Sequence, residues 1–423
     1  MGALIAVAAI LLALAGAPLF AIFGGTALAL FYGDGTDVAA VIVEMHRIST
    51  LPMLITIPLF TFAGYLLAES RAPQRIVRFS QALVGWMPGG LAIGALAVSA
   101  FFTAFTGASG VTILAIGGLM MPVLIADGYP EKFATGLLTT SGSIGLLFPP
   151  SLPIILFGLV SGTSIDNLFI AGLLPGLLIV VLISLYSMRT SITQRIPRHA
   201  FSWRELALAS RGMIWELPLS IIVIGGIYSG VFTATETAAV TAFYAFIVEV
   251  FIYKDLELFK DVPRVMVESM SLVGAILIIL GTVLGFTNYV VDAQIPIRVL
   301  DFVRDYMSNK FVFLALLNVV LLIGGALLDM LSAIMLVPLI LPLAKEFGIH
   351  PVHLGMIYLA NLEIGYSTPP AGLNLFIASF RFKRPIISLY GAALPFLLFY
   401  VIALGLITYL PDLSLVLVRH FGH

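Results

Sequence analysis

Two proline pairs interrupt apolar stretches of the sequence and create backbone groups that could bind ions. Pro149 and Pro150 lie within IGLLFPPSLPIILF, and Pro369 and Pro370 lie within a later apolar segment. A helix that ends before such a pair leaves its last carbonyl oxygens without intrahelical partners, and these oxygens are good ligands for a hard cation such as Na⁺. A helix that begins at the pair points free N–H groups with positive partial charge into the same space. Each break therefore predicts a cation site beside an anion site.

The two breaks occupy equivalent positions of an internal repeat. Residues 122–150 align with residues 342–370 at a constant offset of 220 and without a gap, and both copies end in Ile-Gly-x-x-x-Pro-Pro. We expect the first arm of each break to end near Gly145 or Gly365, and the second arm to begin at Pro150 or Pro370. One proline pair would be explained more simply as an extramembrane turn between two helices, but two pairs at a fixed offset favour functional breaks.

The composition places these breaks in an integral membrane protein. Of the 423 residues, 60% are hydrophobic and 10% are charged, and the mean hydropathy is +1.11, whereas soluble domains carry roughly 25% charged residues. The formal net charge of −1 excludes the basic surface that nucleic acid binding requires. The sequence has no cysteine, and no nucleophile–base pair or metal cluster lies at helical spacing in an apolar segment. We therefore expect no enzyme activity and no cofactor other than a coupling ion.

The apolar segments fall into two halves. We expect an all-α polytopic membrane protein with two structural repeats, residues 1–188 and 212–423, joined by a basic connection at 189–211. Each repeat is expected to carry one re-entrant helical hairpin, at about 131–162 and at about 351–381.

Two shorter features help to define the connections. In the connection between the repeats, Ser202 and Glu205 have the spacing of a capping box that opens a short amphipathic helix ending near Arg211. The N-terminal segment 3–32 is either one long helix or two helices broken at Gly16-Ala17-Pro18. The repeat favours two helices, with the N-terminus outside.

The distribution of basic residues tests whether the repeats are parallel or inverted. If segments 133–161 and 352–380 each enter and leave on one side, 15 of the 21 Lys and Arg residues fall on one side of the membrane, with Lys345 among them and Lys132 opposite. The positive-inside rule places these 15 in the cytoplasm. The first break then enters from outside and the second from inside, so the repeats are inverted. Inverted repeats with broken helices are typical of secondary transporters, which bind substrate near the membrane midplane.

Three runs of residues resemble a known family. They are GASGVTILAIGGLMMPVLIADGYPEKFATGLLTTSGSIGLLFPPSLPIILFG, GVFTATETAAV and NLEIGYSTPPAGLNLFIAS. They look like the large membrane subunit of tripartite ATP-independent periplasmic (TRAP) transporters, and the resemblance covers essentially the whole chain. It implies an elevator-type transporter of the ion-transporter superfamily, in the bacterial inner membrane and driven by Na⁺. It also implies two partners: a separate small four-helix membrane subunit, and a soluble periplasmic protein that delivers an organic anion such as a sialic or sugar acid or a C4-dicarboxylate.

The resemblance and the backbone argument together predict two Na⁺ sites and a substrate site between the breaks. The first Na⁺ site would comprise Thr106, Ser109, Gly145, Phe148 and Pro150. The second would comprise Asp329, Ser332, Gly365, Thr368 and Pro370. The substrate would contact Ser141, Ser143, Ser151, Ser367, Thr368 and Asn374. No Arg or Lys lies in an apolar segment near the breaks, so helix N-termini, hydroxyl groups and nearby Na⁺ would have to hold a carboxylate substrate.

Three acidic residues in apolar surroundings have alternative interpretations. An aspartate near the middle of a spanning segment costs about 2.5–3.5 kcal/mol to insert, so we expect Asp329 to bind a cation, the alternative being a helix cap or a bond to a hydroxyl. We assign Glu236 to capping a helix start in TATET. Glu363 is left open between a structural hydrogen bond and the site.

Two other kinds of transport protein share these features. A self-sufficient sodium–dicarboxylate symporter would need no binding protein, but its relatives usually carry Ser-Asn-Thr at the tips, where this chain has FPPS and STPPAG. An anion channel would conduct without a Na⁺ gradient. We therefore expect Na⁺-coupled uptake of an organic anion, with the self-sufficient symporter as the alternative.

Overall fold

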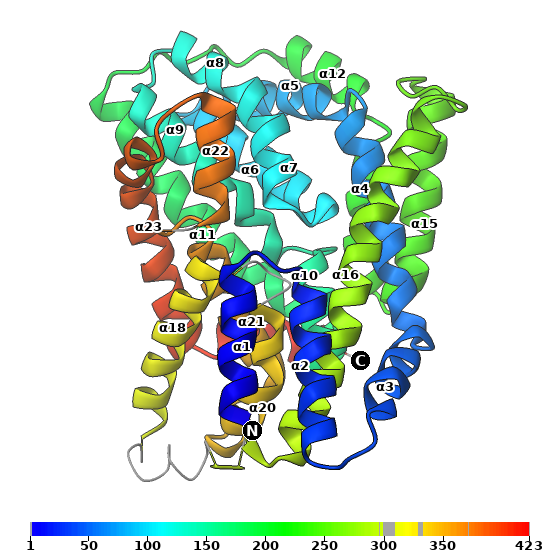
Figure 1. Ribbon diagram of the computed structural model, residues 1–423. Helices are drawn as coiled ribbons and strands as arrows, with labels where there is room; N and C mark the ends of the chain where they lie inside the picture. Colours follow the sequence, from blue (N-terminus) through cyan, green and yellow to red (C-terminus); the bar gives the residue numbers. More distant parts are fainter. Residues whose placement is uncertain (1, 296, 299–308, 329–332, 371, 423) are drawn as a thin grey trace.

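The computed structural model of this chain describes residues 2–295, 297–298, 309–328, 333–370 and 372–422, and within these ranges it contains helices and no strand (Figure 1). Seven of the described helices are long and apolar enough to cross a membrane, and the number rises to nine if two bent pairs each count as one span. Helices satisfy their backbone polar groups within one segment, as an apolar medium requires. The predicted all-α polytopic membrane architecture is confirmed.

The N-terminal segment forms two helices, α1 (Gly2–Leu14) and α2 (Leu19–Gly33). The chain turns between them at Gly16, whose φ of 80° lies in the left-handed region that glycine adopts without a Cβ penalty. Pro18 then precedes α2 in extended backbone. The predicted break at Gly16-Ala17-Pro18 is confirmed.

A group of helices around α16 (Asp261–Asp292), here called the α16 layer, forms one side of the molecule (Figure 1). α16 packs on α2, α3 (Ala39–Ser49) and α4 (Thr56–Glu69), and α4 in turn packs on α15 (Ala234–Ile247). A Cβ at Gly285 of α16 would lie 2.8 Å from the side chain of Val41, so the absence of a side chain there allows the close approach of α3.

The first re-entrant hairpin lies at 90–126 rather than at 131–162. α6 (Gly90–Thr106) enters, the chain turns at Gly107 (φ 64°), and α7 (Ser109–Thr112), the π-helical η2 (Ile113–Gly117) and α8 (Gly118–Ala126) return. Leu91 at the start of α6 and Val123 near the end of α8 line the same surface cavity. Both ends of the hairpin therefore lie on one side of the molecule.

The first Pro-Pro segment crosses the molecule, and the predicted hairpin at about 131–162 is wrong. α9 (Glu131–Thr140) continues as the 3₁₀-helical η3 (Ser141–Leu147), and α10 (Leu152–Ser161) follows with a bend of only 44°. α9 packs on α23 (Ile386–Tyr409), whereas α10 packs on α20 (Val337–Glu346) and α21 (Pro351–Gly365). The segment is a broken span, because its two arms continue in nearly the same direction.

The second half has the same two elements in the opposite orientation. α18 (Lys310–Leu327), η6 (Ile334–Leu336) and α20 form a hairpin whose ends meet where the Lys310 ammonium donates to the Gly348 carbonyl at 3.4 Å. α21 begins beside one end of α23, where the His353 imidazole lies 3.3 Å from the Thr408 carbonyl. α22 (Leu373–Phe382) ends beside the other end of α23 (Figure 1). The second Pro-Pro segment is therefore also a broken span, and the predicted hairpin at about 351–381 is wrong.

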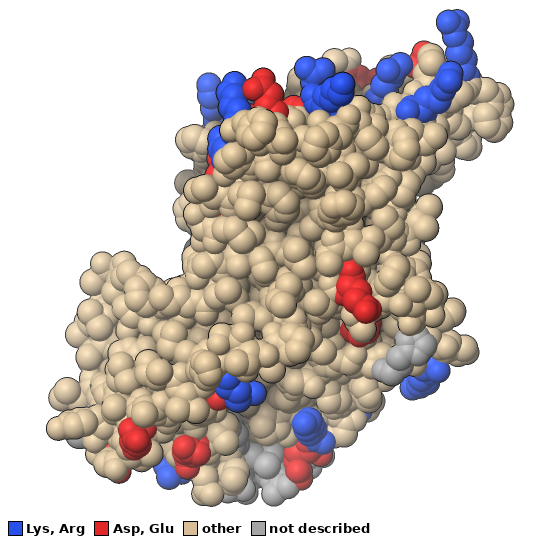
Figure 2. Space-filling model, turned by 90° about the vertical axis from the view of Figure 1, so that its right-hand side faces the viewer, with Lys and Arg blue, Asp and Glu red and all other residues tan. Residues whose placement is uncertain are grey.

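The corrected topology moves two lysines to the other side of the membrane. Glu131 forms an ion pair with Arg384, so Lys132 lies on the same side as Arg384, whereas Lys345 lies with Lys310 on the opposite side. Exchanging these two lysines leaves 15 of the 21 basic residues on one side. The basic side chains gather at the end of the molecule that carries α5 (Ala72–Val84) and α12 (Trp203–Gly212) (Figures 1 and 2). The positive-inside rule still places this end in the cytoplasm.

The remaining helices connect these elements. They are η1 (Pro52–Ile55), α11 (Ile165–Thr193), α13 (Leu217–Ser220), η4 (Ile221–Gly225), α14 (Gly226–Tyr228), η5 (Val248–Ile252) and α24 (Asp412–Phe421). The hydroxyl of Ser202 accepts a hydrogen bond from the Glu205 N–H at 3.3 Å, which confirms the predicted start of α12. A complete capping box between Thr233 and Glu236 opens α15, which confirms the structural assignment of Glu236.

One buried ion cluster joins the two halves at the end of the molecule that carries α5. Arg75 of α5, with a side chain only 15% exposed, pairs with Glu216, Glu249 and Asp255 of the second half. The guanidinium also lies 3.8 Å from the centre of the Tyr253 ring. Burial by itself lowers the pKa of Arg75, but the three carboxylates outweigh this effect and the pKa is raised, so the arginine stays charged.

The revised topology can be tested in this cysteine-free chain. Lys132→Cys is expected to react with a membrane-impermeant maleimide from the same side as Arg204→Cys in the inter-repeat connection, because Lys132 lies beside Arg384. Lys345→Cys is expected to react from the opposite side. Labelling in right-side-out and inverted vesicles measures this. Reaction of Lys345→Cys from the side of Arg204→Cys, with Lys132→Cys reacting from the opposite side, would restore the hairpin topology.

Replacement of Arg75 is expected to be strongly destabilising. Arg75→Gln leaves three carboxylates in buried surroundings without their cation, a change that typically costs about 3–5 kcal/mol. Arg264→Gln is the matched control, because the side chain of Arg264 is 47% exposed and such pairs contribute at most about 1 kcal/mol. Thermal unfolding of the purified variants compares the two, and equal melting temperatures would show that the Arg75 cluster does not hold the halves together.

Candidate functional site

The tip of the first hairpin packs directly against the first break. The Thr103 hydroxyl of α6 donates to the Gly142 carbonyl at 2.7 Å. A Cβ on Gly142 would lie 3.2 Å from the Ser109 carbonyl oxygen, and a Cβ on Gly145 would lie 2.3 Å from a backbone oxygen of α6. Thr106 and Ser109 are both buried at this tip. The structure therefore brings the two parts of the first predicted Na⁺ site together.

The backbone of the first break is extended where ligands were predicted. The Gly145 carbonyl accepts a hydrogen bond from the Phe148 N–H at 3.0 Å, which leaves its second lone pair available to a cation. Phe148 itself has φ −93° and ψ 142°, outside any helix. The second arm begins at Leu152 rather than at Pro150, because Pro153 occupies the first turn, where a missing N–H costs nothing.

The second break has the same close contact with its hairpin. α21 ends at Gly365, as predicted, and a Cβ on Gly365 would lie 2.4 Å from the carbonyl carbon of Gly325 in α18. The second arm begins at Leu373 rather than at Pro370. Both Pro-Pro peptide bonds, 149–150 and 369–370, are cis.

The carbonyls of the second break each accept one hydrogen bond. The Gly365 carbonyl accepts from the Thr368 N–H at 3.0 Å, and the Pro370 carbonyl accepts from the Tyr390 hydroxyl at 2.8 Å. Each keeps one lone pair for a cation. Asp329 and Ser332, predicted to complete this site, lie outside the described residues.

The two broken spans touch at equivalent positions of the repeat. The Ser143 hydroxyl lies 3.3 Å from the Glu363 carbonyl oxygen, to which it can donate a hydrogen bond, and these two residues are separated by 220 positions, the offset of the repeat. If a two-fold axis relates the two repeats, a residue that contacts its own equivalent in the other repeat lies near that axis. The breaks therefore meet at the centre of the molecule.

Glu363 is the most unusual charged residue at this centre. It is fully buried, and its two carboxylate oxygens have no hydrogen-bond partner among the described residues. The Tyr400 hydroxyl of α23 lies beside this carboxyl, but it donates to the Thr140 carbonyl at 2.9 Å. An ionised carboxylate is costly in such surroundings without a cation. The sequence alone left Glu363 open and missed Tyr400, because nothing in the apolar pattern of α23 distinguishes that tyrosine.

Most of the hydroxyl groups predicted to contact substrate already have protein partners. The Ser141 hydroxyl bonds to a serine of α6 at 3.3 Å, and the Thr368 hydroxyl bonds to a carbonyl of α21 at 2.8 Å. The Asn374 amide nitrogen donates to the Ser367 hydroxyl at 3.2 Å. The Ser151 hydroxyl and the Asn374 amide oxygen are buried and have no partner among the described residues. These two atoms are the strongest candidates for a polar ligand.

The donor set at the breaks suits a hard cation. Carbonyl and hydroxyl oxygens surround both contacts, and no group of three or more His, Asp or Glu residues in the described part of the chain is placed to hold a metal ion. Oxygen ligands of this kind favour Na⁺, Ca²⁺ or Mg²⁺ over transition metals.

Comparison with known proteins supplies a family. A sequence profile described as "Tripartite ATP-independent periplasmic transporter, DctM component" matches residues 4–413. The C4-dicarboxylate TRAP transporter large permease protein DctM of Pseudomonas aeruginosa is 36% identical over 404 residues, which is 94% of this chain and 93% of that protein. The ectoine/5-hydroxyectoine TRAP transporter large permease protein UehC of Ruegeria pomeroyi is 32% identical over 92% of this chain and 91% of that protein.

A solved structure shares the fold at low sequence identity. The YdaH transporter of Alcanivorax borkumensis superimposes with a TM-score of 0.63 and 14% identity, over 87% of this chain and 86% of that chain. This similarity concerns the arrangement of the helices alone.

The glycine contacts between hairpins and breaks make a direct prediction. Gly145→Ala and Gly365→Ala are each expected to lower the stability by about 1–3 kcal/mol, because their added Cβ atoms would collide with backbone rather than with a side chain that can move. Gly405→Ala is the matched control, since a Cβ there has nothing within 4 Å. Thermal unfolding measures the difference, and wild-type stability of both Gly145→Ala and Gly365→Ala would contradict the close contact.

Proposed function

This chain belongs to the DctM-component family of tripartite ATP-independent periplasmic transporters, and we propose that it takes up an organic acid across the bacterial inner membrane, coupled to Na⁺ entry. Uptake is secondary active transport, with the gradient of Na⁺ as its source of free energy. The chain is the membrane permease of this system and carries no enzymatic step.

The observation that carries this proposal is the pairing of hairpin tips with broken spans. Each half places a tip against a break, at Ser109 with Gly142 and at Gly325 with Gly365. Broken helices near a membrane midplane present carbonyl oxygens to cations and helix N-termini to anionic groups. Two such places, related by one repeat, support two Na⁺ sites flanking one substrate site.

In this proposal the Na⁺ ligands come from both partners of each pairing. The first ion is bound by Thr106, Ser109 and the carbonyls of Gly145, Phe148 and Pro150. The second ion is bound by Asp329, Ser332 and the carbonyls of Gly365, Thr368 and Pro370. The substrate lies between them, where Ser151 and Asn374 offer unpaired polar atoms and where Ser141, Ser143, Ser367 and Thr368 complete the surroundings.

The number of ions follows from the charge of the substrate. One elementary charge that moves down a potential of about 100 mV gains about 2.3 kcal/mol. Two Na⁺ ions make the uptake of a monocarboxylate electrogenic, whereas a dicarboxylate needs a third. The substrate classes in the names of the relatives differ, so we propose an organic acid as the class, such as a sugar acid or a C4-dicarboxylate.

An elevator movement fits the division of the molecule into two parts. The hairpins and broken spans form a body that packs on the α16 layer, and the contact between them includes a glycine: a Cβ on Gly64 of α4 would lie 2.3 Å from the Phe105 carbonyl oxygen of α6. In this proposal the body slides along α4 and carries ions and substrate together.

Two partners complete the proposed system. A small four-helix membrane subunit would cover part of the lipid-facing surface, and a soluble periplasmic protein would deliver the substrate. Both follow from the family, whose members are named as components of tripartite systems.

Transport assays in proteoliposomes test this function. This chain, its small subunit and the binding protein are reconstituted with labelled organic acids and an imposed Na⁺ gradient. Uptake is expected to require both Na⁺ and the binding protein. Ser109→Ala and Asp329→Asn are each expected to weaken the Na⁺ dependence, because the first removes an oxygen ligand and the second removes a negative charge, whereas Gly405→Ala should leave uptake unchanged.

The outcomes separate the proposal from its alternative. Na⁺-driven uptake without any binding protein would identify a self-sufficient symporter and remove the assigned partners. Conduction of the anion without a Na⁺ gradient would overturn coupled transport altogether.

A further inference from the structure

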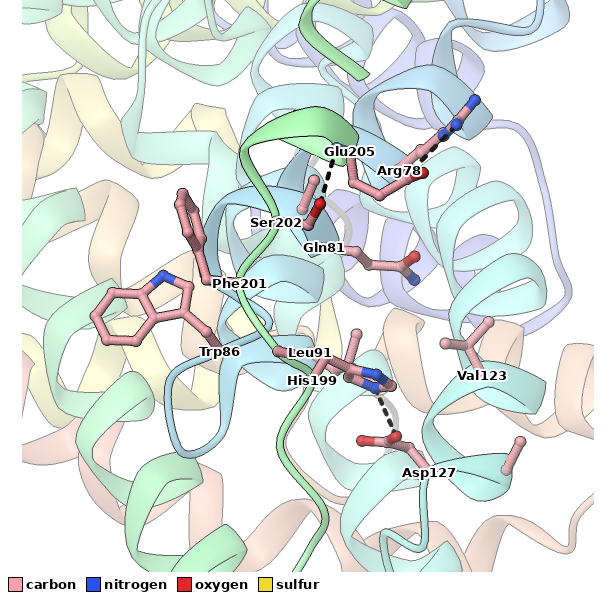
Figure 3. Close-up of a pocket in the computed structure, with 13 residues that line it drawn as sticks. Arg78, Gln81, Trp86, Leu91, Val123, Asp127, His199, Phe201, Ser202 and Glu205 are labelled. Carbon is pink, nitrogen blue, oxygen red and sulfur yellow. Dashed lines mark hydrogen bonds and ion pairs between the residues drawn. The ribbon is translucent and has the colours of Figure 1, made fainter. Parts of the chain in front are cut away.

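A cavity of about 750 Å³ lies at the cytoplasmic end, away from the two breaks (Figure 3). It is bounded by α5, by both ends of the first hairpin and by the inter-repeat connection before and at the start of α12. None of the residues that line it belongs to the candidate Na⁺ or substrate sites described above. Its lining combines four groups that carry or can acquire charge with aromatic rings.

The charged groups of this cavity are paired, two basic with two acidic. Arg78 lies 3.3 Å from Glu205, and both side chains are more than half exposed (61% and 57%). The His199 Nε2 lies 2.8 Å from the Asp127 carboxylate, with His199 59% exposed. Figure 3 shows the two pairs on either side of the Gln81 amide. The exposed Arg78–Glu205 pair contributes little to stability, so a ligand with both charges can replace it at small cost, whereas Asp127, only 12% exposed, offers a more buried carboxylate.

The aromatic residues place the cavity at the membrane–water boundary. Trp86 is 49% exposed and packs edge-on against Phe201, which in turn packs against Trp203, itself 77% exposed. Exposed tryptophan is enriched at the level of lipid headgroups. α5 and α12 pack on each other at the cation-rich end of the molecule (Figures 1 and 2), and amphipathic helices with aromatic and basic residues lie in this region of a bilayer.

From these observations we propose that the cavity binds the headgroup of a cytoplasmic-leaflet phospholipid that carries both a phosphate and a primary ammonium. Arg78 and His199 contact the phosphate, and Glu205 and Asp127 accept hydrogen bonds from the ammonium. The lipid chains leave the cavity past Trp86 and Phe201 into the surrounding bilayer.

Charge selects this headgroup over the other common ones. With His199 protonated the four groups sum to zero, and with His199 neutral they sum to −1. A purely anionic headgroup would occupy Arg78 and His199 with its phosphate and leave Glu205 and Asp127 without a cation. A trimethylammonium headgroup carries the right charge but has no N–H to donate to Glu205 and Asp127. Phosphatidylethanolamine has both features.

The bound lipid would join parts of the chain that are distant in sequence. Leu91 and Val123 bring the two ends of the first hairpin to the cavity, Arg78 brings α5, and His199 brings the inter-repeat connection. The lipid therefore contacts both ends of an element that also carries a candidate Na⁺ site at its tip.

Native mass spectrometry of the full chain tests the proposal. The purified, delipidated protein is titrated with phosphatidylethanolamine, phosphatidylglycerol and phosphatidylcholine that have the same acyl chains. Phosphatidylethanolamine is expected to bind about fivefold more tightly than the other two, the size of one exposed ion pair. Arg78→Gln and Glu205→Gln should each reduce binding to the level of phosphatidylcholine. Arg204→Gln, a cation of the same connection outside the cavity lining, should leave the preference unchanged.

Three results would overturn the proposal. Equal binding of all three lipids would show that the cavity does not select a headgroup. Tighter binding of phosphatidylglycerol would show that the basic residues of this end of the molecule attract anionic lipid irrespective of the cavity. If soluble glycerophosphoethanolamine displaced phosphatidylethanolamine when both are at the same concentration, the ligand would be a free metabolite and not a membrane lipid. If a single variant unfolds, the double variant Arg78→Glu/Glu205→Arg is used in its place. It keeps one positive and one negative charge in the cavity and is expected to bind phosphatidylethanolamine with the wild-type preference.

Discussion

The requirement that every backbone polar group find a partner away from water governs the rest of this structure. A helix that stops within the membrane exposes carbonyls and N–H groups, and each unsatisfied group costs several kcal/mol. Here the two stops are covered by hairpin tips that pack at backbone distance, through Gly142 and Gly145 in one half and Gly325 and Gly365 in the other. The carbonyl oxygens that would lack a partner in lipid are here available to a cation. The cost of breaking a helix is thus the source of the proposed ion sites.

The general fold could be predicted from sequence because composition and punctuation are local signals. Gly16 and Pro18 predict the break before α2, and the pattern Ile-Gly-x-x-x-Pro-Pro predicts both interruptions. The topology of the interruptions could not be predicted, because the count of basic residues is the same for two arrangements. Lys132 and Lys345 exchange sides and leave the total at 15. Only tertiary contacts, such as the ion pair of Glu131 with Arg384, distinguish a hairpin from a broken span.

The parts of the candidate site that depend on local backbone chemistry could be predicted from the sequence. The parts that depend on tertiary packing could not. Gly365 ends its helix as its position before the proline pair predicts. The start of the second arm shifts to Leu152 because Pro153, not Pro150, takes the first turn. Thr103 and Tyr400 meet the first break through their hydroxyl groups, and neither residue type nor spacing marks them in an apolar run. Such residues become visible only when segments distant in sequence are brought together.

The contact between Ser143 and Glu363 has a consequence for the origin of the chain. Two positions that are equivalent in a repeat and also touch would, in an ancestral pair of identical half-length chains, be one residue facing its own copy across an isologous dimer interface. A symmetric pair with glutamate at this position would bury two carboxyl groups at the centre, and one with serine would bury none. Serine on one half and glutamate on the other is an arrangement that two identical half-length chains cannot hold. Fusion of the halves therefore permitted a lone buried carboxyl at the centre of the molecule, which a symmetric dimer could have carried only in duplicate.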